Sequence, residues 1–139
     1  MSARTAGGAA GGEPSEPIGA AMICVSWDCP DPRAGAAFYR ELTGWDVLAS
    51  EDTHAVLGDG PRMITLVRKD DYRPPSWPEE GPVPMRFHLD FAVQDVDAAV
   101  ERLLALGATR PGHQRAGHGI TVLLDPAGQP FCIGPAQPR

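Results

Sequence analysis

Two cysteines, one histidine and one aspartate have a spacing that could bring them into one site. His88 and Asp90 stand two residues apart in the alternating stretch RFHLDFAV, so a strand there directs both side chains to one face. Cys24 and Cys132 lie in similar stretches, MICVSW and PFCIG. Cysteine and histidine bind zinc, so Cys24, His88 and Cys132 could hold a metal ion, with Asp90 orienting the imidazole. Alternatively, these groups form a hydrogen-bonded polar spot in a pocket and hold no metal.

Other side chains with binding chemistry lie in or near the predicted loops. Arg68 could meet an anionic group, or it could simply be solvated. Tyr72 and Trp77 lie in a proline-rich segment, where they could stack on a flat ligand or fix the segment to a sheet edge. His113 and His118 in GHQRAGHG are a weak metal signal, because the glycines disfavour the helix that would align them.

Two stretches of the chain repeat the same order of structural signals. Each begins with a strand-like alternation, continues into an amphipathic helix and ends at a glycine. Asp31 and Asp95 stand where the helices would begin, and an aspartate there accepts hydrogen bonds from free amides of the first turn. Gly44 and Gly107 stand where they would end. The two aspartates are 64 residues apart and the two glycines 63, which indicates an internal repeat.

Three short strand-like segments follow each predicted helix. They read WDVLAS, HAVLG and RMITLVRK in the first half, and ATRPGHQ, GITVLLD and PFCIG in the second. The turn signals GDGP and DPAGQP lie between neighbouring segments. We therefore predict an α+β fold of two βαβββ modules, 22–69 and 86–135, which pair curved mixed sheets around a concave cavity with the helices outside.

The rest of the chain is predicted to connect or extend this pair of modules. Residues 70–85 carry five of the prolines and no periodicity, so they are a linker. Residues 1–21 are rich in glycine, alanine, proline and serine, and we expect a flexible tail there. The remainder, 22–139, is predicted to be a single domain.

The repeat also assigns equivalent positions in the two modules. Cys24 and His88 each stand seven residues before the aspartate that begins the helix of their module. Leu66 and Cys132 each stand seven residues after the aspartate of their turn. We therefore predict that these four side chains point into the cavity. Alternation alone places Leu66 opposite Thr65 and leaves open which of the two faces inward.

Three motifs resemble the vicinal oxygen chelate superfamily, which includes glyoxalase I, extradiol dioxygenases and bleomycin-type resistance proteins. They are DPRAGAAFYRELTGW, HLDFAVQDVDAAVERLLALGA and LLDPAGQPFCIGP, and the resemblance covers about residues 20–135. It implies a divalent metal held by four inward positions, usually His or Gln, Glu, His and Glu. These correspond here to Cys24, Leu66, His88 and Cys132, and only His88 keeps the expected type. The His-His-Glu triad of the dioxygenases and the glutamate base of glyoxalase I are absent.

We therefore expect a metal-free small-molecule-binding protein of the glyoxalase/bleomycin resistance type that sequesters an antibiotic or natural product. Its ligand would be a small aromatic or planar organic molecule. The alternatives are a metal-dependent lyase or isomerase of glyoxalase type, with Zn, Ni or Fe at Cys24, His88 and Cys132, and a cofactor-free biosynthetic enzyme. The predicted ligand-binding residues are His88, Asp90, Cys24, Leu66, Arg68, Cys132, Trp77 and Tyr72.

Charge and cysteine content bear on partners and compartment. A formal net charge of −6 disfavours nucleic acid, which needs a basic face. No apolar run approaches the length of about 20 residues that spans a bilayer. Three cysteines without a paired spacing indicate reduced thiols, so we expect a cytoplasmic protein without a signal peptide. The resemblance implies a homodimer with paired cavities.

Overall fold

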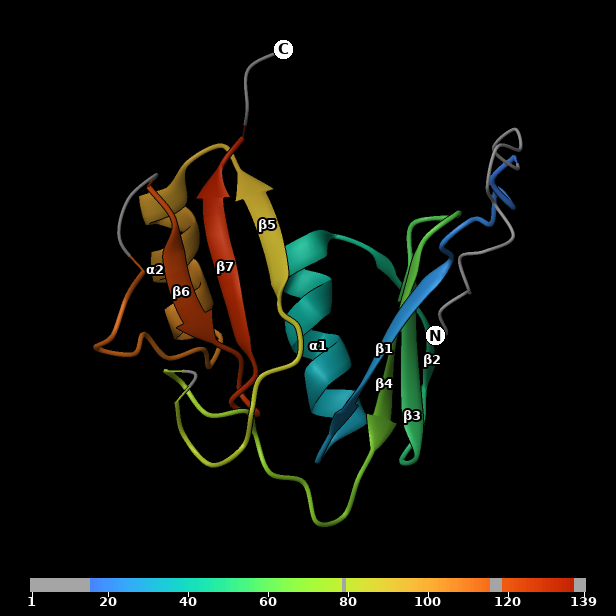
Figure 1. The fold of residues 1–139 in the computed structure, drawn as a ribbon, viewed down its shortest axis with the longest axis horizontal. Helices are drawn as coiled ribbons and strands as arrows, with labels where there is room; N and C mark the ends of the chain where they lie inside the picture. Colours follow the sequence, from blue (N-terminus) through green and yellow to red (C-terminus); the bar gives the residue numbers. More distant parts are fainter. Residues whose placement is uncertain (1–15, 79, 116–118, 137–139) are drawn as a thin grey trace, which may run out of the picture.

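The computed structural model describes residues 16–78, 80–115 and 119–136, and this part of the chain forms two helices and seven strands (Figure 1). One sheet, sheet A, has the strand order β1-β4-β3-β2, and the other, sheet B, has the order β5-β7-β6. Parallel and antiparallel pairs occur in both, so the predicted α+β class with mixed sheets is confirmed. In chain order the elements are β1 (Cys24–Cys29), α1 (Pro32–Thr43), β2 (Asp46–Ser50), β3 (His54–Gly58), β4 (Met63–Arg68), β5 (Leu89–Val93), α2 (Val96–Ala105), β6 (Thr121–Leu124) and β7 (Pro130–Pro135).

The helix boundaries follow the signals that the sequence carries. The carboxylates of Asp31 and Asp95 each accept a hydrogen bond from the backbone N–H three residues further on, at 3.2 and 3.0 Å. Gly44 has φ 75° and donates its N–H back to the last turn of α1. Leu106 ends α2, and Gly107 follows it with φ 111°. These positive φ angles suit glycine, which has no Cβ to clash with the backbone.

One predicted strand, ATRPGHQ, forms only in part. Thr109 and Leu124 exchange two backbone hydrogen bonds, of 2.9 and 2.8 Å, in an isolated bridge. Pro111 has no N–H with which to continue the ladder. The side chain of Gln114 takes over, since its amide donates to the carbonyl of Val122 at 3.0 Å and accepts from the N–H at 2.8 Å. Sheet B therefore has three strands where sheet A has four.

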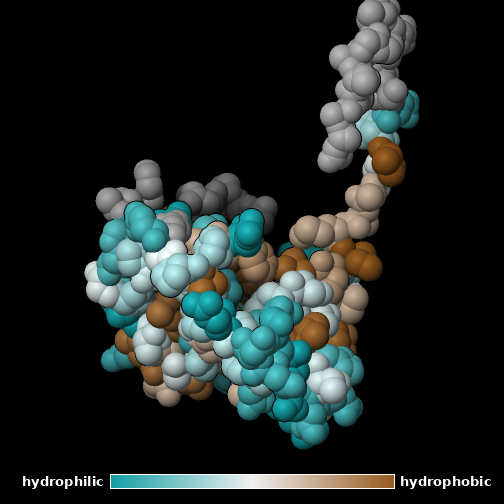
Figure 2. All heavy atoms as spheres, turned by 60° about the horizontal axis from the view of Figure 1, so that its bottom comes forward, coloured by the Kyte–Doolittle hydropathy of each residue, from teal (hydrophilic) through white to brown (hydrophobic). Residues whose placement is uncertain are grey.

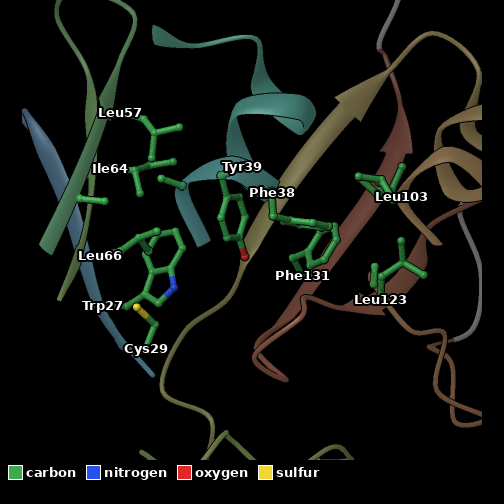
Figure 3. Close-up of a cluster of buried hydrophobic side chains, with 14 of the residues drawn as sticks. Trp27, Cys29, Phe38, Tyr39, Leu57, Ile64, Leu66, Leu103, Leu123 and Phe131 are labelled. Carbon is green, nitrogen blue, oxygen red and sulfur yellow. The ribbon is translucent and has the colours of Figure 1, made fainter. Parts of the chain in front are cut away.

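Helix α1 lies between the two sheets rather than outside both of them (Figures 1 and 3). On one side the ring of Tyr39 lies 5.3 Å from that of Trp27 on β1, edge to face. On the other side the ring of Phe38 lies 5.9 Å from that of Phe131 on β7. All four aromatic side chains are buried in one core, which is shared by the two modules.

A buried hydrogen bond also ties α1 to the second module. The hydroxyl of Tyr39 donates to Asp125 at 2.6 Å. The other carboxylate oxygen of Asp125 accepts from the backbone N–H groups of Ala127 and Gln129, at 2.8 and 2.9 Å, and so closes the DPAG turn. Burial raises the pKa of Asp125 despite these bonds, and burial beside this carboxylate raises the pKa of Tyr39. Packing and polar contacts thus both fix α1 against module two.

Candidate functional site

Each sheet has one face against the helices and another, here called the helix-free face, that points away from them. On β1 the burial alternates, with Trp27 in the core and Ser26 and Asp28 exposed. On β5, Phe91 packs against the core and Asp90 is exposed. The predicted alternation of these two strands is confirmed. Because α1 lies between the sheets, the two helix-free faces lie on the far sides of the sheets from α1.

Leu66 does not lie on the helix-free face, contrary to the prediction. Its side chain is 1% exposed and belongs to the core beside α1 (Figure 3). The register pairs Ser26 with Thr65 in sheet A and Asp90 with Cys132 in sheet B, so Thr65 is the equivalent of Cys132. The two turns differ in length, so counting seven residues from the aspartate of each turn gave Leu66 instead of Thr65. A shift of one residue moves a side chain to the other face of a strand.

His88, Asp90 and Cys132 come together on the helix-free face of sheet B. Nε2 of His88 lies 3.0 Å from Oδ1 of Asp90. The Cys132 thiol neighbours the Asp90 carboxylate, and one donor atom from each of the three residues falls within 4.8 Å of the others. The side chain of His88 is 24% exposed and that of Asp90 is 72% exposed, whereas Cys132 is buried. The cluster is therefore open to solvent on the Asp90 side.

The Cys132 thiol is not activated as a nucleophile. Burial raises its pKa to about 11, and the neighbouring Asp90 carboxylate adds to the rise. A catalytic cysteine needs the opposite shift, which a positive neighbour usually supplies. The imidazole of His88 is paired with Asp90 instead. The cluster can therefore act as a polar contact for a ligand or as a set of metal donors, rather than as a Cys-His nucleophile.

Cys24 has different surroundings on the helix-free face of sheet A. Its Sγ lies 3.2 Å from the hydroxyl of Thr65 and 3.5 Å from that of Ser26. Hydroxyl donors stabilise a thiolate, so they lower the pKa of Cys24. Among residues 16–78, 80–115 and 119–136, the only group of three metal-binding side chains that converges is the one on sheet B, and Cys24 is not part of it. The predicted trio of Cys24, His88 and Cys132 is thus not assembled in this structure.

The four positions at which the resemblance implies a metal are therefore Cys24, Thr65, His88 and Cys132. They offer one imidazole, two thiols and a threonine hydroxyl, with no carboxylate among them. Cys24 and Thr65 are hydrogen-bonded to each other. This set does not fit a metal site built from imidazole or amide groups and two glutamates.

A cavity of about 390 Å³ lies between the beginnings of β1 and β4 and the strand β5. Its volume is within the range of about 300–1,000 Å³ that is usual for small-molecule sites. The polar residues along it are Cys24, Arg62 and Asp90. The apolar lining includes Met22, Ile23, Val25, Trp45, Leu89 and Phe91.

Two features of the cavity were not predicted from the sequence. Trp45 packs against the core and also lines the cavity, where the guanidinium of Arg62 lies over its ring at 5.6 Å from the centroid. Met22 and Ile23 at the mouth are 77% and 58% exposed. Figure 2 shows apolar surface where the N-terminal segment joins the body of the molecule. The alternation of apolar residues predicts strands near Trp45, Met22 and Ile23, but it does not predict how the two sheets pack and so could not place these residues in a cavity.

Three of the predicted ligand-binding residues lie elsewhere in the described part of the chain. Arg68 is exposed and forms an ion pair at 2.9 Å with Asp70. Trp77 donates its indole N–H to the backbone carbonyl of His113 at 2.9 Å, so it fixes the linker to a loop of module two. The Tyr72 hydroxyl is buried without a hydrogen-bond partner among the described residues. His118 lies outside the described residues, as do residues 1–15 of the predicted tail.

Comparison with known proteins agrees with this architecture. Residues 22–134 match the family model described as a glyoxalase-like domain. A glyoxalase/bleomycin resistance protein/dioxygenase family enzyme from Burkholderia phytofirmans is 24% identical over 82% of this chain and 97% of its own, with a TM-score of 0.63. The fosfomycin resistance protein FosX from Listeria monocytogenes is 16% identical over 86% and 93%, with a TM-score of 0.62.

The bleomycin-binding protein from Streptomyces verticillus, solved with copper(II)-bleomycin, is 15% identical over 86% of this chain and 99% of its own, with a TM-score of 0.55. At these identities the similarity to solved structures concerns the fold alone. No curated protein sequence matches the chain. In the described part of the chain, neither helix is long and apolar enough to cross a membrane.

Proposed function

Because the chain belongs to the glyoxalase-like domain family, we propose that it binds a small organic molecule in the cavity between β1, β4 and β5. The observation that carries the proposal is the composition of this cavity. Its volume of about 390 Å³ is lined mainly by apolar residues, and the charged residues along it are Arg62 and Asp90. Apolar burial supplies affinity in such sites, and a few placed polar groups supply orientation.

The lining favours a planar or aromatic ligand. Trp45 offers a flat apolar surface at the cavity, and aromatic rings stack on such surfaces with a gain of about 0.5–1.5 kcal/mol beyond burial. Arg62 already lies over this ring and is paired at 2.6 Å with Asp59. A planar ligand that inserts between Arg62 and Trp45 would replace this cation–π contact with a stacking contact to Trp45 and a cation–π contact to Arg62.

Binding is favoured over turnover by the residues at the positions that correspond to the family's glutamates. Thr65 and Cys132 stand there, and neither is a general base at neutral pH, since the pKa of Cys132 is raised to about 11. We therefore place sequestration of an antibiotic or natural product before a glyoxalase-type lyase or isomerase and before a cofactor-free biosynthetic enzyme. The fold is shared with a bleomycin-binding protein and a fosfomycin resistance protein. We also place the chain in the cytoplasm, because its three cysteines are free thiols and suit a reducing compartment.

We also propose that two copies of the chain associate as a homodimer. Met22 and Ile23 are exposed at the cavity mouth, and a second copy that covers them would close the cavity and bury apolar surface. Light scattering coupled to size exclusion should give the mass of a dimer, and Ile23→Asp should lower it to that of a monomer. A wild-type protein that stays monomeric at high concentration would contradict this.

Tryptophan fluorescence tests the binding proposal directly. A panel of planar aromatic natural products should contain compounds that quench the emission, and Trp45→Phe should remove most of that quenching. The matched control is Trp77→Phe, because Trp77 contacts the loop at His113 and should leave the quenching in place. If Trp77→Phe removed the quenching and Trp45→Phe did not, the ligand would bind near Trp77 and outside the cavity. Recovery of the compound unchanged, checked by mass spectrometry, separates binding from turnover.

A further inference from the structure

The cluster on the helix-free face of sheet B is held by a rigid backbone. Asp90 and Cys132 are direct partners in the parallel ladder of β5 and β7, and His88 precedes Asp90 by two residues on the same face. Sites on strands hold their side chains more accurately than sites on loops. The three donor atoms are therefore brought together by the sheet itself.

The donor atoms have the types and separations of an incomplete zinc site. Zinc binds imidazole, carboxylate and thiolate at about 2.0–2.3 Å, so tetrahedral ligands stand roughly 3.3–3.7 Å from one another. Nε2 of His88 and Oδ1 of Asp90 are 3.0 Å apart, and all three donor atoms lie within 4.8 Å of each other. Small side-chain rotations would suffice to seat an ion. The sulfur donor favours zinc over magnesium or calcium, which prefer oxygen.

We propose that His88, Asp90 and Cys132 form a zinc site that belongs to module two alone. It differs from the set that the family resemblance implies, which takes two ligands from each module. Asp90 is not one of those four positions, and sheet A contributes nothing to the group. The loss of the shared metal site at Cys24 and Thr65 therefore does not remove metal binding from this chain.

The fourth coordination position of this zinc is open. Cys132 and His88 lie on the inner side of the cluster, while the Asp90 side chain is 72% exposed. Asp90 also lines the cavity between β1, β4 and β5. Three protein ligands with an open position are typical of zinc that binds water or a small molecule, rather than of structural zinc.

Zinc titration of the whole chain tests the site without any assumption about the cavity ligand. The protein is purified under reducing conditions, stripped with a chelator and titrated with Zn²⁺ against a chromophoric competitor. We expect one ion per chain. Replacement by Co²⁺ should give a thiolate-to-cobalt charge-transfer band in the near ultraviolet, which reports directly that a cysteine is bound.

Variants identify the ligands. Cys132→Ser and His88→Ala should each weaken zinc binding by more than about a hundredfold, and Asp90→Asn by at least about tenfold, since losses of about 10–100-fold follow removal of a mere outer-shell partner. Cys132→Ser should also abolish the cobalt band. Cys29→Ala and His54→Ala are the matched controls, because they remove the same donor types outside the cluster and should leave both readouts unchanged.

Two results would overturn the proposal. The first is a wild-type chain that binds no zinc at micromolar concentration, which would leave the three side chains as a hydrogen-bonded group. The second is a Cys132→Ser variant, folded by circular dichroism, that keeps its zinc affinity and its cobalt band. Neither result depends on quenching of Trp45, so failure of the metal site and failure of the small-molecule site can be told apart.

Discussion

The helix-free faces of the two modules occupy the same register and carry different chemistry. In sheet A the face holds Cys24 and Thr65, joined by a weak hydrogen bond of 3.2 Å. In sheet B the corresponding positions are His88 and Cys132, with Asp90 between them. The pKa of Cys24 is lowered by hydroxyl donors, whereas that of Cys132 is raised by burial and by a carboxylate.

The comparison shows which parts of a repeated unit are constrained. The helix-facing positions must be apolar in both modules, because α1 packs against both sheets with Phe38 and Tyr39. On the helix-free face of sheet A the side chains are only partly buried, so residues such as Cys24 and Thr65 can change without a large loss of folding free energy. Binding chemistry can therefore differ between the modules while the backbone frame stays the same.

The largest expected effect tests which side of β4 faces the core. Leu66→Ala should lower the free energy of unfolding by about 2–5 kcal/mol, because Leu66 is 1% exposed in the shared core. Thr65→Ala should cost much less, since Thr65 lies on the helix-free face. Urea denaturation of both variants measures the difference. Equal losses would mean that the register equating Thr65 with Cys132 is wrong.

A second experiment compares the two thiols directly. In metal-free native protein at pH 8, Cys24 should react with iodoacetamide roughly a hundredfold faster than Cys132, because only the thiolate reacts and the two pKa values are shifted in opposite directions. Mass spectrometry of alkylated peptides over time gives both rates. In urea the rates should converge, and a native ratio near one would remove the contrast between the two faces.

A smaller effect concerns the bond that joins the modules. Tyr39→Phe should lower the free energy of unfolding by about 1.5–3 kcal/mol, because the buried carboxylate of Asp125 loses a charge-assisted hydrogen bond of 2.6 Å. Tyr72→Phe is the matched control. Its hydroxyl is buried without a partner among the described residues, so its removal should cause no loss. A loss in Tyr72→Phe as large as that in Tyr39→Phe would contradict this account.

Local rules predicted the elements well. The capping aspartates Asp31 and Asp95 and the glycine Gly44 act within one turn of the residues that they cap, so sequence spacing suffices to find them. The strand alternation placed His88 and Asp90 on one face for the same reason.

Features that depend on distant parts of the chain were harder to predict. The position of α1 between the sheets depends on Phe131, which is far away in sequence. The face of Leu66 depends on a register set by turns of different length. The grouping of His88 and Cys132 follows from the repeat, but the absence of Cys24 from that group depends on how the two sheets are placed around α1 (Figure 1), and no local pattern encodes this.

The side chain of Gln114 has a consequence for solubility. A sheet edge with free backbone groups is a template on which other chains can pair and aggregate. At the outer edge of β6, Gln114 occupies both backbone groups of Val122, and the bridge to Thr109 occupies those of Leu124. A proline-broken segment thus caps β6, and this edge of sheet B resists intermolecular β-pairing without a fourth strand.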